Sequence, residues 1–404
     1  MFPLPVQSGT QFRTLQLLQR LSRRFDVTFL TLAADPDNLA QMGEFEGHCT
    51  KAIAIVPDNK RSAWQRAAYK ALYWARRLAL ADSLDRFYNT MPSVNCAIRT
   101  ELACGQYDIL FCEYWFWDRR IFDFQGLKVI DANDVQAMRV ESLLDRTTQP
   151  LDRLFKRRLV ARYRRMEIEG LSLADLVVAT TRRDRDAFAA MLPPRVETIV
   201  IPTGLDTEYF VPQEGIRPEP DHVVFYGALS NPMNRDAARF LVEEILPRLR
   251  ARVPGVRLTL VGAFPQPEHY EMAKRDPGIR LTGYVEDVRA PLSRAAVVVC
   301  PLRFGYGIRG RIFELLSMNV PVVATPIAVA GMDLAAGDGL MLAEGADAFA
   351  TAVADLLCDP ARRAALAERG REVAVQRMSI EATYDKLVEH LAQRVGLEAA
   401  TTAP

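Results

Sequence analysis

The sequence has few of the residues that hold structural metals or form disulfides. Its 404 residues include only six cysteines and four histidines. No two cysteines have the C-x-x-C spacing and the histidines are scattered, so we expect no metal site and no disulfide framework. Cys112 and Cys300 lie in apolar, strand-like runs, where a buried reduced thiol is the usual state.

Long apolar runs and an excess of one charge are also absent. No apolar run approaches the ~20 residues of a membrane-spanning helix, and the first residues do not have the pattern of a signal peptide. Lys and Arg together number 51 and Asp and Glu 50, so the net charge is +1. That balance argues against nucleic-acid binding through bulk positive charge. We therefore predict a cytoplasmic protein with no nucleic-acid partner.

The order of the apolar segments predicts two α/β domains, since a chain of this length exceeds one ordinary core. In the second half, near-continuous apolar runs alternate with helical patterns, which is typical of a parallel sheet covered on both faces. The strands expected there are 222–226, 256–261, 279–282, 296–300, 320–325 and 339–342, and the helices are 234–252, 267–274, 288–294 and 309–318. The strands expected in the less regular first half are 27–32, 52–56, 108–113, 128–131, 176–179 and 198–201.

The composition also predicts where the domains divide. We expect a first domain, a linker rich in Pro and Gly, a second domain and a terminal helical segment, in residues 1–203, 204–221, 222–379 and 380–404. The chain opens with what looks like the loop after a first strand, leading through Gly9 into a helix over 10–24. Either Met1 is an internal methionine of a longer reading frame, or the first domain lacks its first strand.

The segment PLRFGYGIRGRIFELL has the pattern of an anion-binding turn. An apolar strand leads into a turn with Gly305 and Gly307, and Arg309 and Arg311 follow at the start of a helix. The backbone N–H groups and the dipole of a helix N-terminus attract phosphate, and arginine adds forked donors that match phosphate oxygens. Glu314 lies about one turn further into the helix, where its carboxylate can accept hydrogen bonds from sugar hydroxyls. The pattern therefore predicts a site for a diphosphate beside a ribose.

The same segment resembles the donor-binding segment of GT-B glycosyltransferases of family 4, which reads P-x-x-x-G-x-G-[ST]-R-x-K-x-x-E-A. The positions in register are Pro301, Gly305, Gly307, Arg309, Arg311 and Glu314. Four further stretches resemble signatures of the polysaccharide-associated branch of this family, in the same order along the chain: DANDVQ, VIPTGLDTEYFVP, VVFYGALSNPMNRDAA and LTGYVEDVR.

The resemblance implies an α/β fold of the GT-B type, with two Rossmann-like domains facing across a cleft and the last helix crossing back to the first domain. It implies a retaining, metal-independent, hexosyltransferase-like enzyme that needs no cofactor. Such an enzyme moves a sugar from a nucleotide diphosphate sugar to a glycan or lipid-linked saccharide acceptor in cell-surface polysaccharide synthesis. Two alternatives stay open. One is a degenerate GT-B subunit that binds a partner transferase, and the other is a sugar-nucleotide epimerase or hydrolase.

The resemblance also implies roles for individual residues. Those expected in catalysis are Arg309, Arg311, Glu314 and Asn133. Those expected to contact the donor are Gly9, Gly227, Tyr284, Val285, Gly305, Tyr306 and Gly307. Two positions depart from the family pattern. Tyr306 stands where many members have an acid, and Asn133 stands where the D-x-H motif has its histidine, so the latter can hydrogen-bond but cannot titrate near neutrality.

Two basic segments admit two interpretations. Residues 60–86 combine Trp64 and Trp74 with several arginines at helical spacing, and residues 153–165 form a second basic helical pattern. For residues 60–86, one interpretation is an interfacial helix on the anionic inner surface of a membrane, facing a lipid-linked acceptor. The other is an ordinary amphipathic helix with its tryptophans in the core. For residues 153–165, the alternatives are a contact with the acceptor or the membrane and a solvated basic face.

Overall fold

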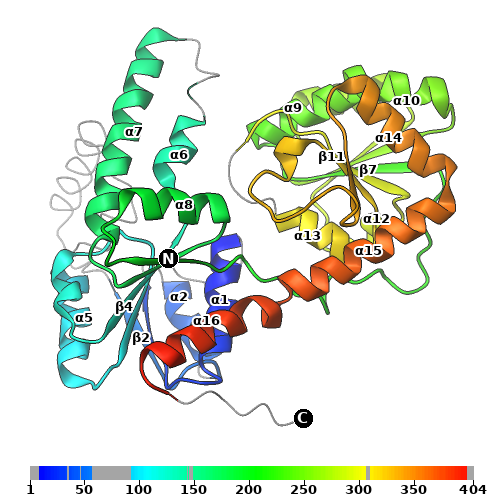
Figure 1. Cartoon of the computed structure of the whole chain (residues 1–404). Helices are drawn as coiled ribbons and strands as arrows, with labels where there is room; N and C mark the ends of the chain where they lie inside the picture. Colours follow the sequence, from blue (N-terminus) through cyan, green and yellow to red (C-terminus); the bar gives the residue numbers. More distant parts are fainter. Residues whose placement is uncertain are drawn as a thin grey trace. The chain divides into compact units, whose positions relative to one another are not determined.

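The computed structural model describes residues 9–33, 36–45, 47–56, 92–142, 144, 149–305 and 310–397. The chain divides into two compact units (Figure 1). The first unit comprises Met1–Thr203 and Tyr384–Pro404, and the second comprises Gly204–Thr383. The division between the units thus lies at residue 203, and the segment predicted as a linker, 204–221, belongs to the second unit.

The second unit is built on one parallel sheet of six strands in the order β12-β11-β10-β7-β8-β9. The strands are β7 (His222–Tyr226), β8 (Arg257–Val261), β9 (Ile279–Gly283), β10 (Val297–Cys300), β11 (Val322–Ala324) and β12 (Leu340–Leu342). All six strands predicted for this half are present. Every residue of β10 and β11 is buried, as expected for strands covered on both faces.

Helices cover both faces of this sheet (Figure 1). They are α9 (Pro232–Phe240), η3 (Leu241–Ile245), α10 (Leu246–Arg252), α11 (Pro267–Arg275), α12 (Arg289–Ser293), α13 (Gly310–Ser317), η4 (Pro326–Ala328), α14 (Ala346–Cys358) and α15 (Pro360–Met378). The single helix predicted over 234–252 contains a π turn, η3, in its middle. Pro247 explains the irregularity, because it has no N–H for the carbonyl one turn earlier and its ring disturbs the regular α-helical ladder.

The strands described in the first unit form two parallel sheets. One pairs β1 (Thr28–Leu32) with β2 (Lys51–Ile55), and the other has the order β3-β4-β5-β6. The bounds of this second group are β3 (Ile109–Glu113), β4 (Leu127–Asn133), β5 (Leu176–Ala179) and β6 (Glu197–Val200). All six strands predicted for the first half are present, and β4 extends two residues beyond its predicted end, as far as Asn133.

The first unit contains helices of its own and also the end of the last helix of the chain. They are α1 (Gly9–Leu21), α2 (Pro36–Ala40), η1 (Gln41–Phe45), α5 (Pro92–Cys104), η2 (Arg119–Asp123), α6 (Gln136–Glu141), α7 (Pro150–Leu171) and α8 (Arg182–Met191). The last helix, α16 (Ile380–Arg394), begins in the second unit and ends in the first. Within the first unit, its Asp385 pairs with Arg20 and its Arg394 pairs with Glu197. No helix in the described part of the chain is long and apolar enough to cross a bilayer.

Candidate functional site

A small pocket in the second unit lies at the carboxyl ends of two adjacent strands, β7 and β10. From β7 the chain continues outward through β8 and β9, and then returns to the other side of β7 as β10. Open parallel sheets bind ligands at such a reversal of strand order, beyond the carboxyl ends of the strands. The residues that line the pocket are Phe225, Tyr226, Asn234, Cys300, Leu302, Arg311 and Ile312.

Arg311 is the cation of this pocket. One of its terminal nitrogens, Nη1, donates to the Tyr226 carbonyl at 2.7 Å and to Oδ1 of Asn234 at 3.2 Å. Asn234 is buried in α9, and its own amide donates to the carbonyl of Ala228 at 2.8 Å. The guanidinium is therefore held at the end of β7 by fixed acceptors, which keeps its positive charge on the pocket wall.

Two glycines allow this close approach. A Cβ placed on Gly227 would lie 1.7 Å from Nη1 of Arg311, and a Cβ on Gly262 would lie 2.0 Å from the Gly227 carbonyl oxygen. Any larger residue would push Arg311 or the backbone out of place. The sequence predicts that Gly227 contacts the donor, and the structure gives this glycine a further role, which is to leave room for Arg311.

Glu314 places a carboxylate one turn into α13. Its Oε2 is buried and accepts no hydrogen bond from the described residues. Burial raises the pKa of Glu314, while the Arg311 charge and a hydrogen bond with Tyr226 act in the opposite direction. Burial, with a smaller contribution from Glu314, likewise raises the pKa of the Tyr226 hydroxyl. A buried acceptor that lacks a partner suggests that a ligand supplies the donor.

The other predicted donor contacts of the second unit lie at the same edge of the sheet. Gly305 follows β10 with a positive φ of 145°. Tyr284, which is exposed, and Val285, which is half-buried, follow β9. The predicted site residues Tyr306, Gly307 and Arg309 lie outside the described residues, so their roles stay predictions.

Asp287, which follows the same strand, has a local structural role. Its carboxylate accepts the backbone N–H of Arg289 at 2.9 Å at the start of α12 and also pairs with the Arg289 side chain. Asp287 therefore fixes the start of α12 from the position before the N-cap residue, Val288. Arg289 in turn stacks on the Tyr209 ring, 4.0 Å from its centroid.

In the first unit, Asn133 has an unusual backbone conformation. It ends β4 with a φ of 60°, and its carbonyl accepts both the N–H and the hydroxyl of Thr180, at 3.1 and 2.8 Å. Its side-chain Nδ2 is buried and donates no hydrogen bond to the described residues. Positive φ is uncommon outside glycine and, with an unpaired buried amide, is typical of a functional position. Gly9, the other site residue predicted in this unit, is the first residue of α1.

Asp131, two residues before Asn133, forms a buried ion pair with Arg13 that was not predicted from the sequence. Arg13 of α1 donates to both carboxylate oxygens of Asp131 at 2.7 and 3.1 Å, and the two side chains are 1% and 2% exposed. Arg13 also donates to the Pro202 carbonyl at 2.8 Å. Arg13 precedes Leu17 by four residues and so shares the apolar face of α1. An arginine on the apolar face of a helix was the feature of the sequence that could have predicted a buried ion pair.

The segment after Asn133 is held by a second buried acid. Glu167 of α7 accepts the backbone N–H groups of Gln136 and Ala137 at 2.6 and 3.3 Å, where α6 begins. Burial raises the pKa of Glu167 to about 7. Glu167 therefore caps α6 from another helix, and fixes the chain directly after the D-x-N sequence.

Comparison with known proteins agrees with this architecture. Residues 220–359 match the family "Glycosyl transferases group 1". The chain is 30% identical over 241 residues to a GDP-mannose-dependent alpha-(1-6)-phosphatidylinositol monomannoside mannosyltransferase of Mycolicibacterium smegmatis. That match covers 55% of this chain and 63% of the relative, so the chain spans less than two thirds of the relative's length.

Solved structures share the fold over nearly the whole chain. A sucrose-phosphate synthase from Thermosynechococcus elongatus superimposes with a TM-score of 0.66 at 18% identity, covering 96% of this chain and 93% of that one. The Anabaena protein HepE, solved in complex with UDP-glucose, has a TM-score of 0.61 at 14% identity, with 96% of each chain covered. The predicted fold class is thereby confirmed. The chain thus has the GT-B fold of these solved structures, and its residues 220–359 match the group 1 glycosyltransferase family.

Proposed function

We propose that this chain is a retaining glycosyltransferase that moves a sugar from a nucleotide diphosphate sugar to a glycan or lipid-linked saccharide. The observation that carries the proposal is the pocket at the ends of β7 and β10. There the Arg311 guanidinium is held in place by fixed acceptors. Glu314 interacts with the lining residues Arg311 and Tyr226, and its carboxylate has a buried oxygen without a partner among the described residues. A cation beside a sugar-binding acceptor suits a nucleoside diphosphate.

We propose the chemical class of the donor, a nucleotide diphosphate sugar, and leave its nucleotide base unspecified. The name of the mycobacterial relative specifies GDP-mannose, whereas HepE was solved with UDP-glucose. Both ligands contain a ribose joined to a diphosphate. We assign the diphosphate to Arg311 and the N-terminus of α13, and the ribose hydroxyls to Glu314. The base would lie near Tyr284 and Val285, beyond the end of β9.

The proposed chemistry follows from where charge develops. When the sugar leaves its donor, negative charge grows on the departing nucleoside diphosphate. Arg309, Arg311 and the N-terminus of α13 would stabilise that charge without a metal. Asn133 would hydrogen-bond the transferred sugar or the acceptor through its unpaired amide, but it cannot exchange a proton with them near neutrality.

Glu314→Gln tests the assignment of the ribose. We expect the dissociation constant of UDP or GDP to rise about 10-fold or more, because a hydrogen bond to a charged group contributes about 1.5–3 kcal/mol. The melting temperature should stay near that of the wild type, since glutamine has the same shape. Calorimetric titration measures the affinity, and Glu271→Gln, an exposed acid on α11, is the matched control.

Assays of the wild-type protein distinguish a transferase from a hydrolase and from a degenerate subunit. Nucleoside diphosphate released from the donor only when an acceptor is present supports a transferase. Release without acceptor supports a hydrolase, and no binding of UDP, GDP or ADP supports a degenerate subunit. If Glu314→Gln binds nucleotide normally but loses several degrees of melting temperature, Glu314 is a structural residue.

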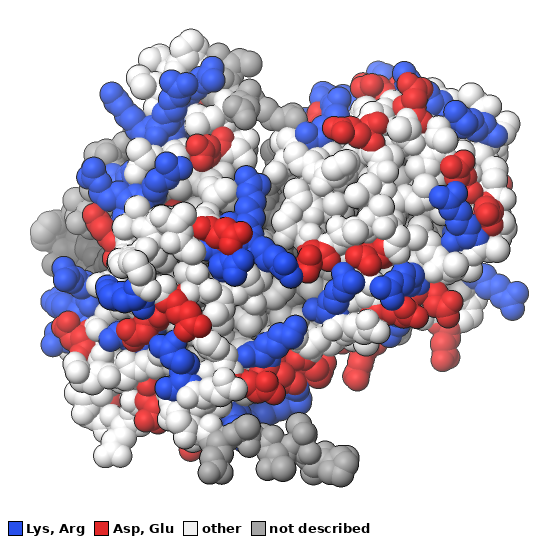
Figure 2. All heavy atoms as spheres, viewed as in Figure 1, with Lys and Arg blue, Asp and Glu red and all other residues white. Residues whose placement is uncertain are grey.

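We further propose that the acceptor is lipid-linked and that the start of α7 contacts an anionic membrane surface. Leu151, Leu154 and Phe155, spaced three and four residues apart on one face, are 83%, 48% and 50% exposed. Exposed arginines flank them at 153, 157 and 158, and Lys and Arg side chains gather over this end of α7 (Figure 2). Apolar side chains flanked by cations match an anionic lipid surface. The other basic segment, with Trp64 and Trp74, lies outside the described residues.

Vesicle sedimentation tests this surface. The wild type should bind vesicles containing anionic lipid and release them with added salt, because salt screens the attraction between exposed charges and the membrane. The double variant Leu154→Glu and Phe155→Glu should lose most of the binding. A variant with Tyr270→Glu, an exposed apolar residue of the second unit, is the control. Equal binding to anionic and neutral vesicles would contradict the proposal.

A further inference from the structure

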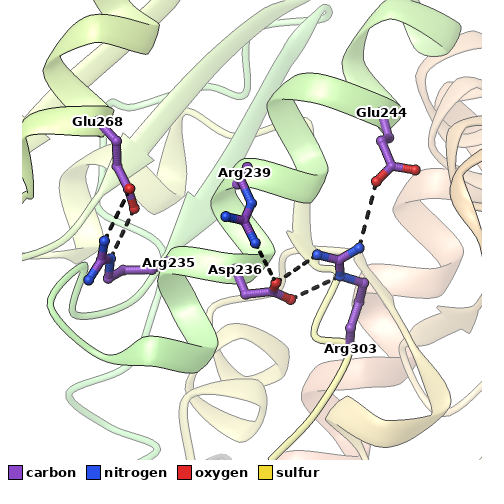
Figure 3. A network of polar contacts seen from close by, with 6 residues as sticks. All are labelled: Arg235, Asp236, Arg239, Glu244, Glu268 and Arg303. Carbon is purple, nitrogen blue, oxygen red and sulfur yellow. Dashed lines mark hydrogen bonds and ion pairs between the residues drawn. The ribbon is translucent and has the colours of Figure 1, made fainter. Parts of the chain in front are cut away.

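A network of charged side chains lies beside the pocket and does not line it. Arg303, three residues after β10, donates to both carboxylate oxygens of Asp236 in α9, at 2.9 and 2.6 Å. Its third nitrogen lies 3.6 Å from Glu244, and its guanidinium lies 4.7 Å from the Phe240 ring centroid. Figure 3 shows Arg303 with Asp236 and Glu244, together with the other charged residues of the network.

Arg303 is held more firmly than an ordinary surface cation. Two carboxylates and an aromatic ring contact it, and the Asp236 side chain is only 11% exposed. Asp236 also accepts a hydrogen bond from Arg239 at 3.1 Å. The forked pairing fixes the direction of the guanidinium as well as its distance. The chain at Arg303 is thus tied to one place on α9.

The same helix holds the pocket cation. Asn234 of α9 accepts from Arg311, and Asp236, two residues later, accepts from Arg303. The connection between β10 and α13 is therefore attached to α9 at both of its ends. Leu302, the neighbour of Arg303, is buried and lines the pocket, and its carbonyl accepts the Thr325 hydroxyl at 2.5 Å. A shift of Arg303 would move this wall relative to Arg311.

We propose that Asp236 and Arg303 are positioning residues for the donor, acting through Leu302 and the start of the turn toward α13. The proposal rests on the proposed function, because it assumes that a nucleoside diphosphate binds in this pocket. Neither side chain lines the pocket, so their effect is on geometry. A displaced Leu302 would fit the bound donor less well and so weaken its binding, whereas a partly exposed ion pair adds little to stability.

The structure supplies a matched control on the same helix. Arg235 makes an equally forked pair with Glu268 of α11, at 2.9 and 3.1 Å, and both side chains are partly exposed (Figure 3). This pair joins α9 to α11, and neither side chain has a hydrogen bond or ion pair with residues 301–305, the described part of the connection after β10. The loss of the Arg235–Glu268 pair can therefore be compared with the loss of the Arg303–Asp236 pair, which lies next to Leu302.

The experiment compares Arg303→Gln and Asp236→Asn with Arg235→Gln. We expect the KM for the donor and the dissociation constant of UDP or GDP to rise about 10-fold in the first two variants and less than twofold in the third. The kcat should change less than the KM, and all three melting temperatures should stay within about 3 °C of the wild type. Asp236→Glu, which keeps the carboxylate, should restore most of the affinity.

Two outcomes would overturn the proposal. In one, Arg303→Gln and Asp236→Asn bind nucleotide as Arg235→Gln does. In the other, affinity falls only in step with the melting temperature, which identifies a structural pair. A wild type that binds no nucleoside diphosphate would reject the proposed function itself, and this inference with it. The wild-type titration therefore separates the two failures.

Discussion

Replacement of Arg13 with methionine is expected to lower the free energy of unfolding of the first unit by about 3–5 kcal/mol, the usual cost of leaving one member of a buried ion pair alone. The substitution leaves the Asp131 carboxylate without its two donors and the Pro202 carbonyl without its side-chain donor. An unpaired carboxylate that is buried away from water must take up a proton, or water must enter the core around it. Urea unfolding followed by circular dichroism measures the change.

Two further variants make the result interpretable. Arg20→Met removes the pair with Asp385, whose side chains are more exposed, and should cost no more than about 1 kcal/mol. The double variant Arg13→Met with Asp131→Leu removes both charges and should recover much of the loss, because apolar replacements of a buried pair are often neutral. Equal losses for Arg13→Met and Arg20→Met would show that burial of the first pair has no special energetic consequence.

Arg311→Gln is expected to weaken UDP or GDP binding about 10- to 150-fold, the equivalent of a charge-assisted hydrogen bond of about 1.5–3 kcal/mol. The rate of transfer should fall further, by on the order of 100- to 1,000-fold, because negative charge on the leaving group grows in the transition state. Glutamine can still donate one hydrogen bond to the Tyr226 carbonyl, so the pocket wall keeps part of its support.

Calorimetry and steady-state kinetics measure the two effects of this substitution separately. Arg280→Gln, an exposed arginine in β9, controls for the loss of one positive charge from the second unit. If Arg311→Gln binds nucleotide and transfers sugar as the control does, Arg311 is not a donor-binding residue. The carboxylate of Glu314 would then be the remaining anchor proposed for the pocket.

The fold could be predicted from the sequence because the strands of both units are short, nearly continuous apolar runs. The exact extent of β4 and the π turn before Pro247 could not, since the first depends on pairing with β5 and the second on a local steric conflict. Gly227, Arg311 and Glu314 were predictable from their positions after a strand and at a helix start. The structure brings Gly227 and Glu314 close to Arg311, and Arg311 lines the pocket.

The partners of these residues were not predictable in the same way. Asn234 and Tyr226 act through contacts with Arg311, about 80 residues away in the sequence. Arg13 and Asp131 are 118 residues apart. A buried polar residue on an apolar face indicates that a partner exists, but only the tertiary fold identifies it. Asn133 was predicted from the family motif alone, and its left-handed backbone was not.

The return of α16 to the first unit sets an order for assembly during synthesis. The ribosome releases residues 9–203 first, but Asp385 and Arg394, which pair with Arg20 and Glu197, follow only after residues 204–383. At about 5–20 residues per second, that interval lasts roughly 10–40 s. The second unit, which is continuous in the chain, can therefore complete its sheet before the first acquires its last helix. Throughout that interval the surface of the nascent first unit that later receives α16 is without its cover, and transiently exposed surface of this kind is prone to aggregation.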